Sequence, residues 1–281
     1  MTTVLDIQRF KDEGRRFAVL TAYDFLSARI LDEAGIPILL VGDSLGMVML
    51  GHPTTLPVTL DDMLHHARAV ARGSRQALLV GDLPFMSYQV STEQAIASAG
   101  RFIQEAGMHA VKLEGGGPVI EITRRLAEIG IPVMGHLGLT PQSVHTMGGF
   151  KVQGKTDAQA ARIMSDAKAL EQAGAFSVVL EGMPSKLANT ITQTLRIPTI
   201  GIGAGPGTDG QVLVLHDMLG LTTGKAPKFV KRYANLAEDI ARAATAYSDD
   251  VRTGKFPGPE HEYSANGSAP AKDREEVRYG G

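Results

Sequence analysis

The chain of 281 residues contains no cysteine, no tryptophan and no long apolar run. Without cysteine, disulfide bonds, thiolate catalysis and cysteine-ligated zinc sites are all excluded. No apolar stretch reaches the roughly 18 residues that a membrane-spanning helix needs. Residues 1–10 lack the basic start and apolar core of a secretion signal. We therefore expect a cytoplasmic protein that has no membrane partner.

The sequence also lacks a strong charge of either sign. Lys and Arg number 28 and Asp and Glu number 30, which gives a formal net charge of −2. This balance gives no sign of a nucleic-acid partner, and we expect none. Hydrophobic residues make up 43% of the chain, enough to bury a large core. The 32 glycines indicate an α/β protein with tight turns between strands and helices.

Short apolar runs recur along the chain, with helical patterns between them. The runs are continuously apolar rather than alternating, which is typical of parallel strands buried on both faces. Several intervening segments, such as "LDEAGIP" and "IQEAGMHA", end a helical pattern on a glycine and pass directly into an apolar run. The predicted strands cover residues 17–23, 37–42, 77–82, 110–115, 132–137, 176–182, 198–203 and 211–217.

A repeated strand–helix unit within about 200 residues favours a (β/α)8 barrel, with a doubly wound open sheet as the alternative. The stretch "AGPGTDGQ" between the last two runs is too short for a crossover helix. We expect a loop or one short helical turn there, and a glycine-rich loop at this place in a barrel often holds an anion.

The end of the chain follows a different pattern. From Pro227 the sequence predicts a long terminal helix. Residues 1–256 are expected to form a single barrel domain that includes this helix. Residues 257–281 are polar and rich in Gly, Pro and Ser, and we expect them to be a disordered tail.

Polar side chains stand at the points where the predicted strands end. In a (β/α)8 barrel these strand ends meet on one face, where catalytic residues come from several strands. A single Asp in such a position is more often a helix cap or a turn residue, and this explanation suffices for Asp24 and Asp217. It does not suffice for a larger group, which we predict to line one polar pocket: Asp43, Asp82, Lys112, Glu114, His136 and Glu181.

Three of these residues, Asp43, Asp82 and Glu114, offer hard carboxylate oxygens. In a chain without cysteine such oxygens favour Mg²⁺ over zinc. Mg²⁺ commonly uses substrate oxygens as further ligands, and a 2-oxo acid offers a carbonyl and a carboxylate oxygen. The cation would then polarise the carbonyl and stabilise an enolate. In this scheme Ser44 and Lys112 hold the substrate carboxylate or the developing oxyanion.

Glu181 lies opposite these residues in the strand order, which makes it the predicted base for the proton next to the carbonyl. Adjacent His65 and His66 fall within a helical stretch instead. Because neighbouring residues of a helix do not face one another, we predict that these two histidines are surface or packing residues.

The longest motifs of the chain match a known family. They are "VGDSLGMVMLGHPTTLPVTLDDMLHHARAV", "DLPFMSY", "VKLEGG", "PVMGHLGLTPQS", "LEGMP" and "IGIGAG". From about residue 4 to residue 256 the sequence resembles the 3-methyl-2-oxobutanoate hydroxymethyltransferase family, also called ketopantoate hydroxymethyltransferase. The resemblance implies a (β/α)8 TIM barrel of the phosphoenolpyruvate mutase and isocitrate lyase superfamily type.

The resemblance also implies an activity. A hydroxymethyl group would pass from 5,10-methylenetetrahydrofolate to C3 of 3-methyl-2-oxobutanoate. The product would be 2-dehydropantoate (ketopantoate), formed through a Mg²⁺-stabilised enolate in pantothenate and coenzyme A biosynthesis. The implied partners are a small keto acid, a folate and further copies of the chain in a homo-oligomer, a decamer.

Carried over by motif, the resemblance assigns a role to each predicted site residue. Asp43 of "GDS" and Asp82 of "GDLP" bind the metal within the substrate site, and Glu114 of "KLEGG" completes the metal site. Glu181 of "LEGMP" is the proton acceptor. The remaining residues bind the keto acid or line its site: Ser44, Lys112 and His136.

Three other interpretations stay open. Lys112 could form a Schiff base as in metal-free aldolases, although adjacent carboxylates keep an amine protonated. The chain could be a lyase or mutase of the same superfamily that acts on phosphonopyruvate or isocitrate, but such lyases commonly carry a "KKCGH" loop and this chain has no cysteine. A non-catalytic barrel serving as an oligomeric scaffold would have lost its metal ligands, and none is lost here.

Overall fold

A computed structural model describes residues 1–222, 224 and 226–263. Eight parallel strands close into a barrel in the order β1 to β8, which confirms the predicted architecture and excludes the open sheet. The barrel closes where β8 pairs with β1, with Val212 opposite Val19. The strands are β1 Phe17–Thr21, β2 Ile38–Val41, β3 Leu78–Asp82, β4 Ala110–Glu114, β5 Val133–Gly138, β6 Ser177–Glu181, β7 Thr199–Ile202 and β8 Gly210–Leu213.

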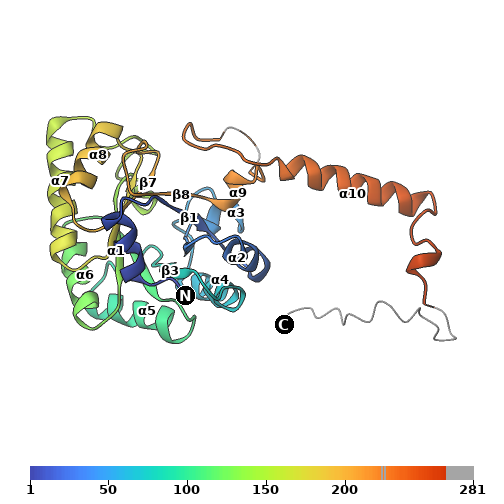
Figure 1. Cartoon of the computed structure of the whole chain (residues 1–281), viewed down its shortest axis with the longest axis horizontal. Helices are drawn as coiled ribbons and strands as arrows, with labels where there is room; N and C mark the ends of the chain where they lie inside the picture. The colour runs from blue at the N-terminus through green and yellow to red at the C-terminus, as the bar shows by residue number, and fades with distance from the viewer. Residues whose placement is uncertain (223, 225, 264–281) are drawn as a thin grey trace. The chain divides into compact units, whose positions relative to one another are not determined.

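Helices surround the strands (Figure 1). Their ends carry the expected signals: Thr59 and Asp62 form a capping box at the start of α4, and Gly35 and Gly174 take positive φ angles just after α2 and α7. In the described residues no helix combines the length and apolar character needed to span a bilayer. The helices are α1 Val4–Asp12, α2 Phe25–Glu33, α3 Leu45–Val48, α4 Leu60–Gly73, α5 Thr92–Gln104, α6 Pro118–Glu128, α7 Asp157–Gln172, α8 Ser185–Thr194, α9 Leu215–Met218 and α10 Leu236–Arg252, with 3-10 turns η1 Pro141–Ser143 and η2 Pro259–His261.

Apolar side chains fill the barrel interior. Val19, Leu40, Val80 and Met134 of four different strands belong to one buried cluster, and Ile7 of α1 joins it. A side chain from outside the sheet therefore helps to fill the interior, so the barrel is packed rather than open. Other apolar residues of the strands pack against the surrounding helices in separate buried clusters.

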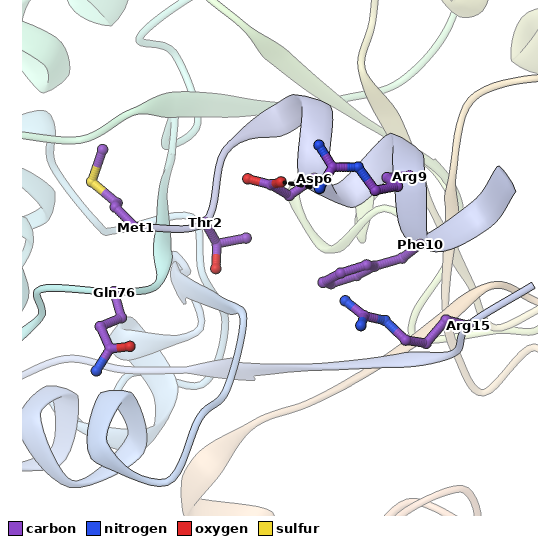
Figure 2. Close-up of a pocket in the computed structure, with 7 residues that line it drawn as sticks. All are labelled: Met1, Thr2, Asp6, Arg9, Phe10, Arg15 and Gln76. Atoms are coloured by element: carbon purple, nitrogen blue, oxygen red, sulfur yellow. Dashed lines mark ion pairs between the residues drawn. The ribbon is translucent and has the colours of Figure 1, made fainter. Parts of the chain in front are cut away.

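A small hollow of about 280 Å³ lies beside α1 and is lined by residues that precede β1 and β3 (Figure 2). Its charged side chains already have partners: the guanidinium of Arg15 lies 3.7 Å from the ring centroid of Phe10, and Arg9 pairs with Asp6 at 3.3 Å. Since these residues precede parallel strands, the hollow lies at the N-terminal end of the barrel. The predicted polar site follows the opposite, C-terminal strand ends.

Two predicted boundaries are wrong by more than two residues. The last strand was expected over residues 211–217, but β8 ends at Leu213 and His216 and Asp217 lie in α9. The chain leaves the sheet here, because the backbone N–H of Leu215 donates to the Thr21 hydroxyl at 3.0 Å rather than to a neighbouring strand. Of the two forms expected between β7 and β8, the structure has the loop, because residues 203–209 contain no helix.

The predicted terminal helix begins at Leu236 rather than Pro227. Residues 227–229 instead line the large cavity described below, and the Phe229 ring packs closely against Gly203. Tertiary packing thus outweighs the helical spacing of apolar residues in this segment. Asn235 and the acidic Glu238 mark the actual start of the helix.

Contacts divide the chain into two units, Met1–Ala234 and Asn235–Gly281. In the second unit, Phe256 contacts Tyr247 of α10 and His261 of η2, with ring centroids 5.5 and 4.9 Å apart. The expected single domain over residues 1–256 stays a prediction. Of the predicted disordered tail, residues 264–281 lie outside the described residues.

Candidate active site

A cavity of about 790 Å³ lies at the C-terminal ends of the barrel strands. Residues that follow or end β2, β3, β4, β5 and β6 contribute polar groups to it, as expected where parallel strands converge. The structure thus brings every predicted site residue into one space: Asp43, Ser44, Asp82, Lys112, Glu114, His136 and Glu181.

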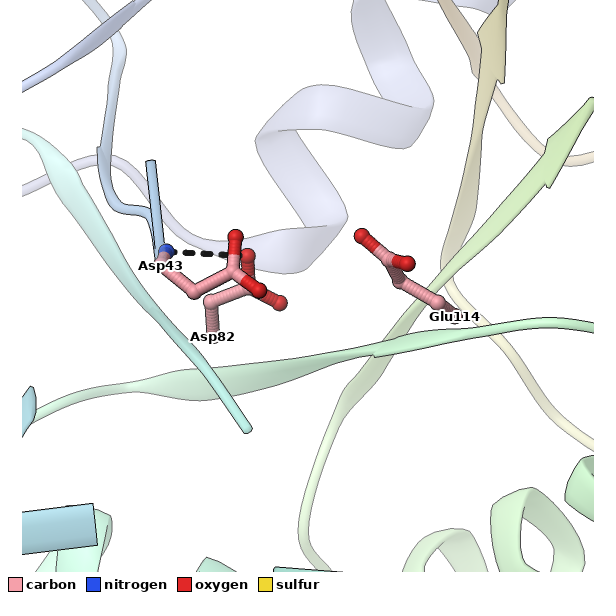
Figure 3. Close-up of side chains that lie close together, drawn as sticks. All are labelled: Asp43, Asp82 and Glu114. Carbon is pink, nitrogen blue, oxygen red and sulfur yellow. Dashed lines mark hydrogen bonds between the residues drawn. The ribbon is translucent and has the colours of Figure 1, made fainter. Parts of the chain in front are cut away.

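Three buried carboxylates form the acidic part of this cavity (Figure 3). Asp43, Asp82 and Glu114 each offer one oxygen, and these oxygens all lie within 4.8 Å of one another. The backbone N–H of Asp43 donates to Asp82 Oδ2 at 3.3 Å, which ties the end of β2 to the end of β3. Three hard oxygen donors facing one space fit a divalent cation of the Mg²⁺ type, so this triad can bind a metal ion.

The three carboxylates of the triad repel one another. Burial and the neighbouring carboxylates of Asp82 and Glu114 raise the pKa of Asp43 well above its usual value. Burial also raises the pKa of Asp82, although Lys112 partly offsets it. For Glu114, the charges of Lys112 and His136 outweigh burial and lower its pKa. A cation between the three groups would relieve this repulsion, which is a second reason why the donor set fits a metal.

Lys112 lies buried against the triad. Its Nζ is 2.7 Å from both side-chain oxygens of Asp82 and 3.6 Å from Glu114 Oε1. Burial alone would lower the pKa of Lys112, but the surrounding carboxylates raise it above the usual value. The amine is therefore held protonated, which disfavours the Schiff-base interpretation because that chemistry needs a neutral amine.

His136 lies between two acidic residues. Its Nδ1 is 3.3 Å from Glu114 Oε1, and its Nε2 is 3.2 Å from Glu181 Oε2. Burial and Lys112 lower the pKa of His136, but the two carboxylates outweigh them and raise it to about 9. The imidazolium thus connects the acidic triad to the predicted base, and the Glu181 side chain keeps 15% of its surface exposed to the cavity.

Two tyrosines form hydrogen bonds with residues of the site, and neither was selected from the sequence. The hydroxyl of Tyr23 lies 2.8 Å from Ser44 Oγ, and the hydroxyl of Tyr88 accepts from the Glu114 N–H at 3.2 Å. Both rings are buried. Tyr23 stands at the end of a predicted strand, which is the one signal that the sequence carried for it.

Gln142 was also missed. It belongs to η1, just after β5, and its side-chain amide donates to Asp43 Oδ2 at 2.9 Å. Its neutral side chain carries no charge that would single it out in the sequence, although it lies within the quoted motif "PVMGHLGLTPQS".

The residues explained as structural behave as expected. Asp24 caps α2 by accepting from the Ser27 N–H at 2.9 Å. Asp217 accepts from the Thr222 hydroxyl at 2.6 Å, although it also lines the cavity. His66 contacts the Tyr23 carbonyl oxygen through Nδ1 at 2.6 Å, and its neighbour His65 is exposed, so the histidine pair serves packing and surface positions.

The remaining wall of the cavity is apolar. It comes from Ile202 at the end of β7, from the loops after β5 and β6 and from the segment before α10. One cavity therefore offers a charged half and an apolar half. The apolar half is lined by Leu139, Pro141, Phe150, Val152, Met183, Ile202 and Phe229.

Residues 1–259 match the family model described as ketopantoate hydroxymethyltransferase. The chain belongs to this family. It is 60% identical over 257 residues to the 3-methyl-2-oxobutanoate hydroxymethyltransferase of Syntrophus aciditrophicus, covering 92% of this chain and 94% of that protein. It is 54% identical over 262 residues to the enzyme of the same name from Thermoanaerobacter pseudethanolicus, covering 93% and 96%. The chain is thus a transferase acting on small-molecule substrates.

Solved structures of lower identity share the fold. A phosphonopyruvate hydrolase in complex with oxalate and Mg²⁺ superposes with a TM-score of 0.60 at 13% identity, covering 94% of this chain and 93% of that one. A 2,3-dimethylmalate lyase, described as a member of the PEP mutase/isocitrate lyase superfamily, gives 0.59 at 19% identity, covering 94% and 89%. These similarities confirm the predicted type of barrel.

Proposed function

We propose that the chain transfers a hydroxymethyl group from 5,10-methylenetetrahydrofolate to C3 of 3-methyl-2-oxobutanoate. The product is 2-dehydropantoate, an intermediate of pantothenate and coenzyme A biosynthesis. The observation that carries this proposal is the family match over residues 1–259, which covers the whole cavity with its acidic triad.

The residues of the triad, Asp43, Asp82 and Glu114, would hold Mg²⁺ with their facing oxygens. When bound, this cation supplies Lewis-acid polarisation of the substrate carbonyl and stabilises the enolate. A 2-oxo acid has the carbonyl and carboxylate oxygens that complete such a site. The proposal therefore accounts for three buried acids in one cavity.

Ser44 and Lys112 hold the keto acid in this scheme. The Ser44 hydroxyl is oriented by Tyr23, so it can donate toward the substrate while its own oxygen accepts from the phenol. The Lys112 ammonium lies at the same wall and offers a fixed positive charge for the substrate's carboxylate or developing oxyanion. His136 lines the site next to the base.

Glu181 acts as the base. It removes the proton from C3, and the electron pair of the broken C–H bond moves into the enolate. The contact with His136 Nε2 at 3.2 Å holds one carboxylate oxygen, which leaves the other for the proton. The enolate carbon then bonds to the one-carbon unit of the folate, water supplies its hydroxyl, and both carbon–nitrogen bonds to that unit break. The proton taken from C3 and one proton of the water end on the two folate nitrogens, so tetrahydrofolate leaves.

The folate takes the apolar half of the cavity. A pterin ring is flat and aromatic, and Phe150, Met183 and Phe229 offer an apolar surface of matching chemistry. We also propose that the protein works in the cytoplasm as a homo-oligomer, a decamer, as the family resemblance implies.

The test is a product assay. The protein is incubated with 3-methyl-2-oxobutanoate and 5,10-methylenetetrahydrofolate, with and without Mg²⁺, and the products are identified by NMR and mass spectrometry. We expect 2-dehydropantoate only when both substrates and the cation are present. Turnover of phosphonopyruvate or isocitrate, with no 2-dehydropantoate formed, would instead support the lyase or mutase interpretation.

A further inference from the structure

We propose that Gln142 is the positioning residue that aligns two carboxylates of the acidic triad for one cation. This inference rests on the proposed metal site but not on the identity of the substrates. Gln142 belongs to the 3-10 turn η1, which directly follows β5 at the cavity, and its side chain is buried.

Gln142 contacts two acids that come from different strands. Its side-chain Nε2 donates to Asp43 Oδ2 at 2.9 Å, and its backbone N–H donates to Glu114 Oε2 at 3.0 Å. Nε2 also donates to the Leu83 carbonyl oxygen at 2.9 Å. A single residue thus fixes one oxygen of Asp43 and one of Glu114, which sets how the other oxygen of each carboxylate faces the triad.

The orientation of the amide is fixed by its other contacts. The Tyr88 hydroxyl donates to Gln142 Oε1 at 2.7 Å, and Gln89 Nε2 donates to the same oxygen at 3.1 Å. If the amide were flipped, its NH₂ group would meet these two donors, and its oxygen would meet the Asp43 carboxylate and the Leu83 carbonyl. The network therefore allows one orientation, in which the donor side faces Asp43.

A neutral donor suits this position for an electrostatic reason. Asp82 is paired with Lys112 and Glu114 lies beside His136, so both already have cationic neighbours. The side chain of Asp43 accepts from the uncharged amide of Gln142 instead. The amide orients this carboxylate without adding a positive charge beside it, so nothing at Gln142 competes electrostatically with a divalent cation.

The primary experiment measures metal binding by the full-length protein without any substrate. Gln142→Met keeps the length of the side chain and the backbone N–H but removes the amide. Hydrogen-bonding partners of metal ligands typically contribute about 10–100-fold in metal affinity, so we expect the Kd for Mn²⁺, followed by electron paramagnetic resonance, to rise by that factor. The Kd for Mg²⁺, followed by calorimetry, should rise in parallel.

Two further variants make the result specific. Tyr88→Phe removes the hydroxyl that orients the amide and also accepts from the Glu114 N–H, and we expect it to weaken Mn²⁺ binding less than Gln142→Met does. Gln153→Met is the matched control, because the Gln153 amide donates to the Lys151 carbonyl oxygen of its own loop at 2.9 Å and, among the described residues, hydrogen-bonds to no acid. Its Kd should equal that of the wild type.

The following pattern distinguishes a positioning role of Gln142 from a purely structural one. If Gln142 positions the metal ligands, saturating Mg²⁺ restores most of the turnover of Gln142→Met, and the thermal stabilisation by Mg²⁺ shifts to higher concentrations. An unchanged Kd in folded Gln142→Met would overturn the inference. If Gln142→Met does not fold, an unchanged Kd in Tyr88→Phe overturns it equally. Absence of Mn²⁺ binding in the wild type would instead overturn the proposed metal site.

Discussion

The ammonium of Lys112 lies 2.7 Å from both side-chain oxygens of Asp82, and both side chains are buried. Lys112 thus provides a fixed positive charge inside a cavity that holds three carboxylates. Lys112 can have two roles, since it can hold the keto acid and it can offset the acidic charges. A substitution of Lys112 tests the second role through its effect on stability.

Lys112→Met should destabilise the protein in the absence of metal. Removing one partner of a buried ion pair leaves an uncompensated charge and commonly costs about 3–5 kcal/mol. We expect a loss of that order in the free energy of unfolding, measured with denaturant in EDTA. Added Mg²⁺ should restore part of the loss, because it replaces the missing positive charge beside Asp82. An equal loss with and without Mg²⁺ would contradict the common location of Lys112 and the metal.

Asp43→Ala should abolish Mg²⁺-dependent turnover while leaving the fold intact. The side chain is buried, but it lines the cavity, and among the described residues its carboxylate forms no ion pair. Asp82→Ala should have the same effect on turnover, with an additional loss of stability because it leaves Lys112 unpaired. The reaction is followed by product NMR, with circular dichroism as the check of folding.

Asp24→Ala is the control for both acids. It removes the cap of α2, so we expect a stability loss of about 1 kcal/mol and unchanged metal dependence. Wild-type turnover in Asp43→Ala and Asp82→Ala would show that these carboxylates do not hold the metal.

Asp32 provides a pH-dependent stabilisation far from the cavity. Its carboxylate accepts from the Ser74 hydroxyl and from the N–H groups of Arg75, Gln76 and Ala77. These hydrogen bonds outweigh burial and lower the pKa of Asp32 below its usual value of 3.8. Because the folded pKa is lowered, the stabilisation is fully present above the unfolded value and is lost as the pH falls through the folded value.

Asp32→Asn should therefore be less stable than the wild type at pH 7, by about 1.5–3 kcal/mol, the scale of a hydrogen bond to a charged group. The difference should shrink as the pH falls below about 4, because the wild-type carboxylate becomes protonated. Denaturant unfolding at several pH values measures this. A difference that stays constant down to pH 2 would contradict the assigned cause.

The proposed homo-oligomer predicts the solution mass. The helix α10 carries Ile240, Tyr247 and Val251 as exposed apolar side chains, and we expect it to contribute to a contact between subunits. Light scattering at micromolar concentration should give a mass well above that of one chain. A monomeric mass would rule out the proposed assembly and the role of α10 in it.

The charged part of the site could be predicted because a local rule governs it. Strands of a parallel barrel end on the same face, so Asp82, Glu114 and Glu181 could be placed together from the strand pattern alone. Gln142 follows no such rule. It reaches Asp43 across 99 positions of the chain through a loop whose conformation depends on the rest of the fold.

The two wrong boundaries have a similar cause. Residues 227–235 carry apolar side chains at helical spacing, but Phe229 packs against Gly203 and lines the cavity, so its side chain is used in tertiary packing. The apolar run after β8 continues to Leu215, whose N–H is bonded to Thr21 rather than to a sheet partner. Periodicity indicates which residues are buried, but not which neighbour they are buried against.

Glu181→Gln tests the proposed base. The substitution keeps the size of the side chain at the end of β6 and removes its basicity. Exchange of the C3 hydrogen of 3-methyl-2-oxobutanoate with D₂O needs no folate, so it isolates proton removal from carbon–carbon bond formation. We expect the exchange rate, followed by NMR with saturating Mg²⁺, to fall by about 10²-fold or more, the usual contribution of a general base.

Binding should survive this change. The triad of Asp43, Asp82 and Glu114 is intact in Glu181→Gln, so the affinities for Mg²⁺ and for the keto acid should stay near those of the wild type, as calorimetry can measure. Glu121→Gln serves as the control, because Glu121 lies on α6 and pairs with Arg124 at an exposed position. If exchange continues at the wild-type rate in Glu181→Gln, another group removes the proton. Glu181 would then serve only as the ion-pair partner of His136 at the cavity wall.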